Sequence, residues 1–321
     1  MTAARHNERQ MDQNKIAIIG TGVIGASWAV CFLARGYDVT SWDPAPDSHA
    51  RLLAQVERQW ASAQALGLAD GASPQRLREC ATLEEAVADA GFVQESAPEQ
   101  VELKRSLFAA LDAAAPAQAI LASSSSGIPA SMFQDACRHP GRVLIGHPFY
   151  PPHLIPLVEV VGGERTSPQV VQEAMAFYRN AGKRPIHIRR ELPGFVTNRL
   201  QAALWREAYG LVHAGVISVE DIDTAIASGP GLRWALLGPF ATQALSGGSG
   251  GIAHVLKHLG PAMDGYWETL LPTRMTSEVV AAVLEGVQQE IGGWDMTAVE
   301  RERDELLVML LRAKAAQTHI P

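Results

Sequence analysis

The stretch KIAIIGTGVIGASWAVCFLARGYDVTSWD, Lys15–Asp43, decides the fold of this 321-residue chain. It begins with the apolar run Ile16–Ile19, which predicts a buried strand. Three glycines in the spacing G-x-G-x-x-G follow, and a helix is expected from Ala26 to Ala34. A second short strand is expected over Asp38–Trp42. The stretch therefore predicts a strand, a glycine turn, a helix and a strand in one compact unit.

The glycine turn indicates a dinucleotide site. Its first glycine permits the tight turn, the second lets a pyrophosphate approach the backbone, and the third lets the helix lie close to the strand. The helix N-terminus then offers N–H groups and a partial positive charge to the phosphates. An acid ends the second strand, where it meets a ribose 2′-hydroxyl and disfavours a 2′-phosphate, so NAD is expected. The alternative is a glycine turn in an ordinary α/β protein. The expected contacts are Gly20, Gly22, Val23, Ile24, Gly25 and Asp43.

The composition is typical of a globular protein of about two domains. Hydrophobic residues make up 47% of the chain and charged residues 19%, which fits a large core. With 27 basic and 34 acidic residues the net charge is −7, and no basic cluster offsets it, so nucleic acid is not expected as a partner. Cys31, Cys80 and Cys137 form no C-x-x-C pair, which fits a reducing cytoplasm and predicts no metal site.

No apolar run reaches the roughly 18 residues of a membrane-spanning helix, so no membrane partner is expected. The first residues, Met1–Asn14, are polar and lack the apolar region of a signal peptide. We interpret them as an N-terminal extension of a cytoplasmic protein.

The first ~190 residues alternate between strand and helix patterns, which predicts an α/β fold with a Rossmann-type, doubly wound, largely parallel sheet. Polar residues cluster after the expected strands, at the edge where such sheets bind ligands. Beyond Leu192-Pro193-Gly194 the patterns are helical. We expect an extension over 1–14, an NAD-binding domain over 15–193 and an all-α domain for substrate binding and dimerisation over 194–321. The apolar helices of the last domain favour a two-fold homodimer.

Four polar residues follow the cofactor unit in the order Ser126, His147, Glu159 and Asn198. A catalytic histidine needs a carboxylate to fix its tautomer and raise its basicity, and Glu159 supplies one if its strand neighbours the strand that ends at His147. A hydroxyl and an amide then hold a substrate oxygen. Beside a nicotinamide, this set predicts an alcohol dehydrogenase.

The segments LASSSSGIP, IGHPFYPPHLIPLVEVV and PGFVTNRL, in this order after the glycine turn, resemble the L-3-hydroxyacyl-CoA dehydrogenase superfamily from Lys15 to Ala313. The double proline of HPFYPPHLIPLVEVV and the segment GPGLRWALLGPF are most similar to a branch that acts on free hydroxy acids. That branch contains L-carnitine dehydrogenase and λ-crystallin, an L-gulonate 3-dehydrogenase.

The resemblance implies a role for each catalytic candidate. His147 is the general base for a 3-hydroxyl, Glu159 orients it, and Ser126 and Asn198 hydrogen-bond the reacting oxygen. Glu99 and Lys104 lie near the nicotinamide ribose. The cofactor contacts implied beyond the glycine turn are Ala97, Glu99, Lys104 and Ser124.

Two segments depart from the family pattern. The family reads S-N-T-S where this chain has Ser123–Ser126, so a serine replaces asparagine at 124. It reads H-x-F-N-P where this chain has His147–Pro151, and the bulkier Tyr150 reshapes the pocket wall.

Arg233 is the candidate for recognising a substrate carboxylate, because a planar guanidinium pairs with a carboxylate through two hydrogen bonds. Trp234, with Tyr150 or Phe149, is placed to face a quaternary ammonium. The alternatives are a domain-interface salt bridge for Arg233 and helix packing for Trp234.

The expected function is NAD-dependent oxidation of the 3-hydroxyl of a small L-3-hydroxy acid, of L-carnitine or L-gulonate type, to the 3-oxo acid. A 3-hydroxyacyl-CoA dehydrogenase of fatty-acid oxidation is one alternative. A non-catalytic, crystallin-like NAD-binding protein is the other.

Overall fold

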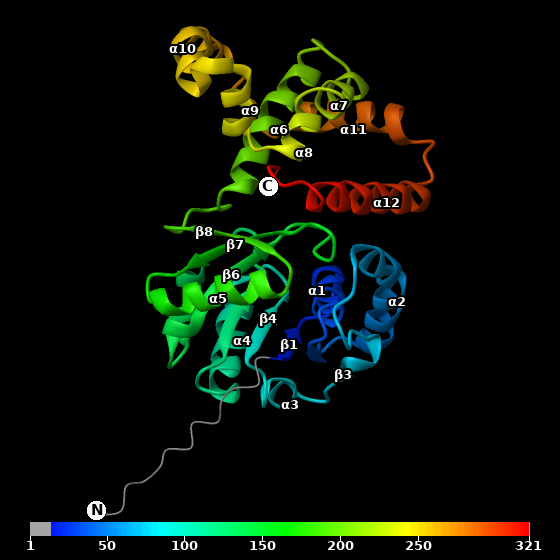
Figure 1. The fold of residues 1–321 in the computed structure, drawn as a ribbon, viewed down its shortest axis with the longest axis vertical. Helices are drawn as coiled ribbons and strands as arrows, with labels where there is room; N and C mark the ends of the chain where they lie inside the picture. Colours follow the sequence, from blue (N-terminus) through cyan, green and yellow to red (C-terminus); the bar gives the residue numbers. More distant parts are fainter. Residues whose placement is uncertain (1–13, 321) are drawn as a thin grey trace, which may run out of the picture. The chain divides into compact units, whose positions relative to one another are not determined.

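The computed structural model describes residues 14–320, and the chain divides into two compact units, one up to Val196 and one from Thr197 (Figure 1). The first unit is α/β, and the described part of the second contains helices and no strand. The proposed N-terminal extension, apart from Asn14, lies outside the described residues. Among the described helices, none is long and apolar enough to cross a membrane.

The first unit is built on an eight-stranded sheet in the order β3-β2-β1-β4-β5-β6-β7-β8. Strands β1 to β6 are parallel, β7 pairs antiparallel with β6, and β8 is parallel to β7. The largely parallel, doubly wound sheet is confirmed. The strands are β1 Lys15–Ile19, β2 Asp38–Trp42, β3 Leu77–Glu79, β4 Phe92–Glu95, β5 Ile120–Ser123, β6 Val143–Pro148, β7 Leu157–Gly162 and β8 Arg184–Ile188.

Helices cover both faces of this sheet, because the side chains of each strand alternate between two cores. Ile16 and Ile18 of β1 belong to one core, with residues of α1, α2 and α5, while Ala17 and Ile19 belong to the other, with residues of α3 and α4. Trp28 stacks on Phe32 in the first core. The helices are α1 Val23–Leu33, α2 Ser48–Leu66, α3 Leu83–Val87, α4 Val101–Ala114 and α5 Pro168–Asn180.

Two local features differ from the expectations. Sequence analysis missed β3, because LRE is only three residues long and has no alternating apolar pattern. The helical pattern that follows Leu192-Pro193-Gly194 forms a helix only from Thr197, because Gly194 and Phe195 both have positive φ angles, 73° and 49°. Thr82 caps α3, since its hydroxyl accepts from the Glu85 N–H.

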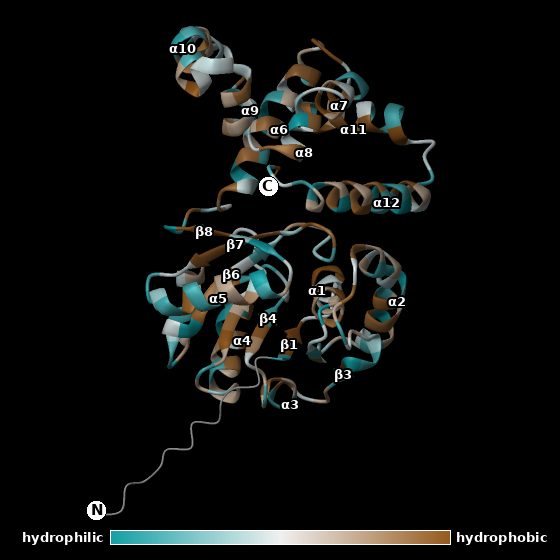
Figure 2. Cartoon of the chain, viewed as in Figure 1, coloured by the Kyte–Doolittle hydropathy of each residue, from teal (hydrophilic) through white to brown (hydrophobic). Residues whose placement is uncertain are grey.

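The second unit exposes many large apolar side chains, and Figure 2 shows brown segments along its helices. Phe240 is 74% exposed, Leu245 70% and Trp267 66%. Its helices are α6 Thr197–His213, α7 Val219–Ala227, α8 Pro230–Leu236, α9 Pro239–Ser246, α10 Gly251–Thr269, α11 Ser277–Ile291 and α12 Met296–Ala315.

Candidate active site

The turn between β1 and α1 is closed to side chains at two glycines and open at the third. A Cβ on Gly20 would meet the Ser96 carbonyl carbon at 2.8 Å, and one on Gly25 would meet the Gly20 oxygen at 1.9 Å. At Gly22, the residue that caps α1, a Cβ would meet nothing within 4 Å. The open backbone at the helix N-terminus fits a pyrophosphate, and Val23 and Ile24 follow in the first turn of the helix.

Asp43 lies beside this turn because β2 pairs with β1 in a register that opposes Ile19 and Trp42. One carboxylate oxygen accepts from the Thr21 N–H at 2.7 Å, and the other accepts from the Ala45 N–H at 2.9 Å. Two backbone donors therefore orient the carboxylate at the end of β2. The residues present fit the dinucleotide: a backbone cradle for the phosphates and a fixed acid for the ribose.

The hypothesis that His147 and Glu159 are neighbours is supported by the sheet. The two residues oppose each other directly in the antiparallel pair of β6 and β7, and His147 Nδ1 lies 2.8 Å from Glu159 Oε2. Glu159 is fully buried, and its other oxygen accepts from the Val196 N–H at 3.2 Å. A carboxylate only accepts hydrogen bonds, so Nδ1 carries the proton and Nε2 becomes the basic nitrogen.

Two phenylalanine rings enclose the imidazole of His147. The ring of Phe149 lies 4.9 Å away, edge to face, and that of Phe195 lies 5.6 Å away. His147 is 5% exposed. The imidazole is thus held in one orientation, in surroundings that exclude most water and strengthen its interaction with Glu159.

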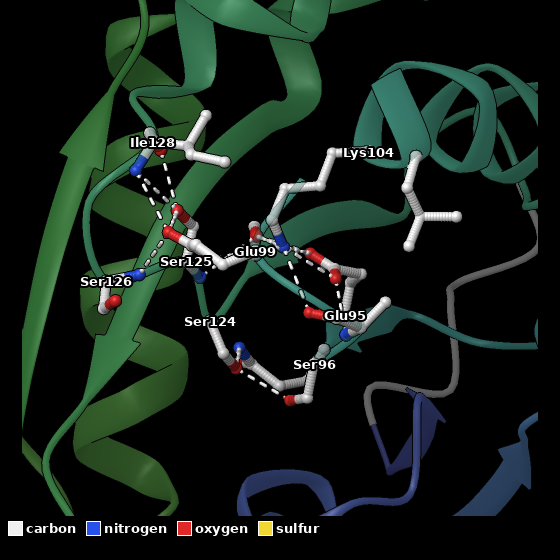
Figure 3. A network of polar contacts seen from close by, with 12 residues as sticks. Glu95, Ser96, Glu99, Lys104, Ser124, Ser125, Ser126 and Ile128 are labelled. Carbon is white, nitrogen blue, oxygen red and sulfur yellow. Dashed lines mark hydrogen bonds and ion pairs between the residues drawn. The ribbon is translucent and has the colours of Figure 1, made fainter. Parts of the chain in front are cut away.

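The loop that carries Ser126 is held by the carboxylate of Glu99 (Figure 3). Oε1 of Glu99 accepts from the Ser125 hydroxyl at 2.6 Å and from the N–H groups of Ser126, Gly127 and Ile128 at 3.1, 2.9 and 3.1 Å. Burial raises the pKa of Glu99, but these bonds and Lys104 lower it more, so the pKa lies below its usual value. Glu99 is therefore ionised at neutral pH and orients the loop.

Sequence analysis missed Glu95, the centre of a buried ion pair next to this loop (Figure 3). Lys104 Nζ lies 2.9 and 3.0 Å from the two oxygens of Glu95, which also accept from the Ser123 hydroxyl at 2.5 Å and the Ala97 N–H at 2.6 Å. Burial raises the pKa of Glu95, against the opposing effect of Lys104. The available signal was the charged residue at the end of the buried strand Phe92–Glu95.

Lys104 is therefore placed differently from the expected cofactor contact. Its side chain is 1% exposed, and its ammonium lies between Glu95 and, at 3.7 Å, Glu99. Ala97 donates its N–H to Glu95 and offers its carbonyl to Lys104 at 3.5 Å. From this position Lys104 can act on a cofactor through Glu99 and the loop rather than by direct contact.

Ser124, the serine in place of the family's asparagine, joins three parts of the first unit. Its hydroxyl oxygen accepts from Trp28 Nε1 at 3.2 Å and from Gln94 Nε2 at 2.8 Å, and it lies 2.9 Å from the Ser96 hydroxyl. Gln94 in turn accepts from the Tyr178 hydroxyl at 2.6 Å. Ser124 thus ties α1, β4 and α5 together at the ends of the central strands.

The remaining candidates lie on separate parts of the chain. Tyr150, 46% exposed, follows β6, while Asn198 lies in the first turn of α6 and Arg233 and Trp234 lie on α8. Within residues 197–320 Arg233 makes no ion pair, and Trp234 is 45% exposed, so helix packing within this unit leaves much of Trp234 uncovered. The domain-interface salt bridge stays an alternative for Arg233. The proximity of Asn198, Arg233 and Trp234 to His147 stays a prediction. Residues 14–320 contain no cluster of three or more His, Cys, Asp or Glu side chains suited to a metal.

Comparison with known proteins identifies the family. The model of the 3-hydroxyacyl-CoA dehydrogenase NAD-binding domain matches residues 15–192, and that of the C-terminal domain of the same family matches 194–290. L-carnitine dehydrogenase of Streptomyces griseus is 52% identical over 94% of this chain and 90% of its own length. That of Pseudomonas aeruginosa is 46% identical over 92% of each chain.

A solved structure has a similar fold over nearly the whole chain. That of 5-formyl-3-hydroxy-2-methylpyridine 4-carboxylic acid 5-dehydrogenase, an NAD⁺-dependent dismutase, has a TM-score of 0.83 and 31% identity over 95% of this chain and 99% of its own. The Escherichia coli 3-hydroxybutyryl-CoA dehydrogenase has a TM-score of 0.63 and 28% identity over 87% of this chain and 56% of its own. The chain therefore belongs to the 3-hydroxyacyl-CoA dehydrogenase family and is an NAD-dependent dehydrogenase.

Proposed function

We propose that this protein oxidises the 3-hydroxyl group of L-carnitine to the ketone with NAD. The observation that carries the chemistry is the buried His147–Glu159 pair, at the edge of the sheet that also bears the glycine turn. The substrate is suggested by the L-carnitine dehydrogenases that are 43–52% identical over most of the chain. L-carnitine is a small 3-hydroxy acid with a carboxylate at one end and a quaternary ammonium at the other.

The two ring nitrogens of His147 have different roles in the proposed reaction. His147 Nε2 takes the proton of the 3-hydroxyl, and Glu159 stabilises the imidazolium that forms at Nδ1. NAD, when bound at the glycine turn, supplies the acceptor for the hydride from C3. Ser126 and Asn198 hold the oxygen while it becomes a carbonyl. Because Glu99 accepts a hydrogen bond from the Ser126 N–H, the backbone that carries the hydroxyl is held in place before substrate arrives.

The two charged ends of L-carnitine need two kinds of contact. Arg233 pairs with the carboxylate through two hydrogen bonds, as a guanidinium does best. Trp234, with Tyr150 or Phe149, faces the trimethylammonium group by cation–π attraction. A CoA thioester offers no carboxylate to Arg233, so this arrangement favours a free acid.

A substrate panel tests the proposal. Purified protein with NAD is assayed with L-carnitine, L-gulonate and 3-hydroxybutyrate, the last both free and as its CoA ester. NADH should form fastest with L-carnitine, and Arg233→Ala should abolish most of that preference. Turnover of the CoA ester alone, unaffected by Arg233→Ala, would contradict the proposal and favour an acyl-CoA dehydrogenase. Absence of turnover above background with every compound would favour a non-catalytic NAD-binding protein.

The domain roles form part of the same proposal. Residues 15–193 bind NAD, and residues 194–321 bind substrate and form a homodimer of a cytoplasmic enzyme. Support for the dimer comes from the exposed apolar side chains of the second unit, such as Phe240 and Trp267, which a second copy would cover. Light scattering coupled to size exclusion should give twice the chain mass. A single-chain mass at micromolar concentration would contradict this part.

A further inference from the structure

The connection between β6 and β7, residues 149–156, joins the base to its carboxylate and carries two of the proposed substrate contacts. It begins with Phe149 and Tyr150 and contains no regular secondary structure. Its own backbone supplies few bonds: the N–H groups of Leu154 and Ile155 both bond to the Pro151 carbonyl, at 3.0 and 2.9 Å. A segment with so few internal bonds needs outside contacts to keep one conformation.

One such contact is a buried lysine. Lys183, between α5 and β8, is 7% exposed, and its ammonium donates to the carbonyls of Pro152 and Ile155, the latter at 3.2 Å. The ammonium also lies 5.2 Å from the centre of the Trp28 ring. Within residues 14–320 it forms no ion pair, so loop carbonyls and an aromatic face are the groups that compensate a buried charge.

The second contact comes from the helix that begins at the glycine turn. Ser27 of α1 is fully buried, and its hydroxyl lies 2.8 Å from Nδ1 of His153 and accepts from the His153 N–H at 3.2 Å. The loop is thus held by two side chains, Lys183 and Ser27 of α1. Both contacts reach the same short segment, from Pro152 to Ile155.

We propose that Lys183 is a positioning residue that, together with Ser27, holds the loop of residues 149–156 and thereby sets the shape of the hydroxy-acid pocket at Phe149 and Tyr150. Burial lowers the pKa of Lys183, and the neighbouring Cys31 thiol opposes this effect only in part. The inference rests on the proposed function for the identity of the substrate. Its structural content, the restraint of the loop by Lys183, does not.

The test compares Lys183→Met, which keeps the length of the side chain and removes its donors, with Arg184→Met. Arg184 is exposed and adjacent, so its variant removes one positive charge without touching the loop carbonyls. Hydrogen exchange of the His153, Leu154 and Ile155 amides should accelerate about tenfold to a hundredfold in Lys183→Met, the effect of losing a hydrogen bond to a charged group. In Arg184→Met it should match the parent protein.

Kinetics separate pocket shape from general weakening. In Lys183→Met, KM for L-carnitine should rise about tenfold while KM for NAD stays within about twofold, because the loop shapes only one of the two sites. Ser27→Ala, which removes the second contact, should accelerate exchange of the His153 amide and also raise KM for L-carnitine. Agreement of the two variants would support restraint of the loop by both side chains.

Three outcomes would overturn the proposal. Unchanged amide exchange in Lys183→Met would mean that the lysine does not hold the loop. Equal increases in both KM values would mean that Lys183 supports the fold as a whole. Faster exchange with an unchanged KM for L-carnitine would mean that the loop does not shape the pocket. If the parent protein oxidises no 3-hydroxy acid, the proposed function fails, while the exchange data still decide whether Lys183 restrains the loop.

Discussion

Two buried carboxylates in the first unit have opposite kinds of partner. Glu159 of β7 faces the imidazole of His147, which keeps 5% of its surface exposed, whereas Glu95 of β4 faces the ammonium of Lys104, which is completely enclosed. An imidazole can exchange a proton with a substrate near neutral pH, and an enclosed ammonium cannot. The first pair therefore suits proton transfer and the second suits structural support, although each is an acid and a base within 3 Å.

The largest expected effect is the loss of activity when His147 of the His147–Glu159 pair is replaced. His147→Ala removes the general base and should lower kcat/KM by about 10³- to 10⁴-fold. The dissociation constant of NAD should stay within about twofold, since the glycine turn and Asp43 are untouched. Steady-state kinetics and calorimetric titration measure the two quantities. Full activity in this variant would end the assignment of His147 as the base.

Replacing Glu159, the proposed orienting acid, should lower activity less than replacing His147. Glu159→Gln retains the shape of the side chain but takes away the charge that stabilises the imidazolium, and a fall in kcat of about 10²- to 10³-fold is expected. Thermal unfolding checks that the variant keeps its fold. If kcat were unchanged while the melting temperature fell, Glu159 would resemble Glu95 in role, and the contrast between the pairs would disappear.

Changes in the Glu95–Lys104 pair should mainly affect stability rather than the chemical step. Glu95→Gln leaves the buried ammonium of Lys104 with only the more distant Glu99, at 3.7 Å, as counter-ion and should lower the free energy of unfolding by about 3 kcal/mol. The double variant Glu95→Gln/Lys104→Met removes both charges and should recover most of that loss. Denaturant titration of the single and double variants gives the coupling. A double variant as unstable as the single one would show that the ion pair is not the cause.

A third buried acid, Asp112 of α4, sharpens the comparison at low pH. Burial raises its pKa, but N–H donors from Arg138 and His139 and the guanidinium of Arg142 lower it more, so the pKa in the fold lies below the usual value. The folded protein therefore binds fewer protons, and the stabilisation is present above the unfolded pKa, about 3.9, and lost as pH falls through the folded value.

Asp112→Asn should accordingly lower the free energy of unfolding at pH 7 by about 1–3 kcal/mol, the contribution of one set of hydrogen bonds to a charged group. Between pH 5 and pH 3 this free energy should then fall less in the variant than in the parent protein, because the variant has no carboxylate at position 112 to protonate. Urea titrations across that range measure it. Parallel pH profiles for the two proteins would contradict the assignment.

The sequence predicted the sheet and the dinucleotide turn because their signals are local. The spacing of Gly20, Gly22 and Gly25 directly constrains the backbone, and each strand after it carries its own apolar run. The pairing of His147 with Glu159 was predicted only on the condition that their strands are neighbours, because no single segment of sequence determines the order of strands in a sheet. Glu95 was missed for the same reason, because its partner on α4 is brought to it only by packing.

The proposed substrate contacts in the second unit were harder to predict from the sequence. Asn198, Arg233 and Trp234 were selected for the chemistry of their side chains, and their own surroundings are exposed or half-buried helix surface. For Lys104 the resemblance located an important residue, but the structure encloses its ammonium between Glu95 and Glu99. Burial of a charged group depends on neighbours distant in the chain, and no periodicity within α4 distinguishes it from an exposed lysine.

The ladder between β6 and β7 has a consequence for how such an enzyme can change. His147 and Glu159 meet because their strands pair in a fixed register, and the connection between the strands is outside that register. Residues 149–156 can therefore be lengthened, shortened or rewritten while the two side chains stay face to face. Mutations in this connection can therefore change the substrate, while the proposed proton-transfer pair in the paired strands stays as it is.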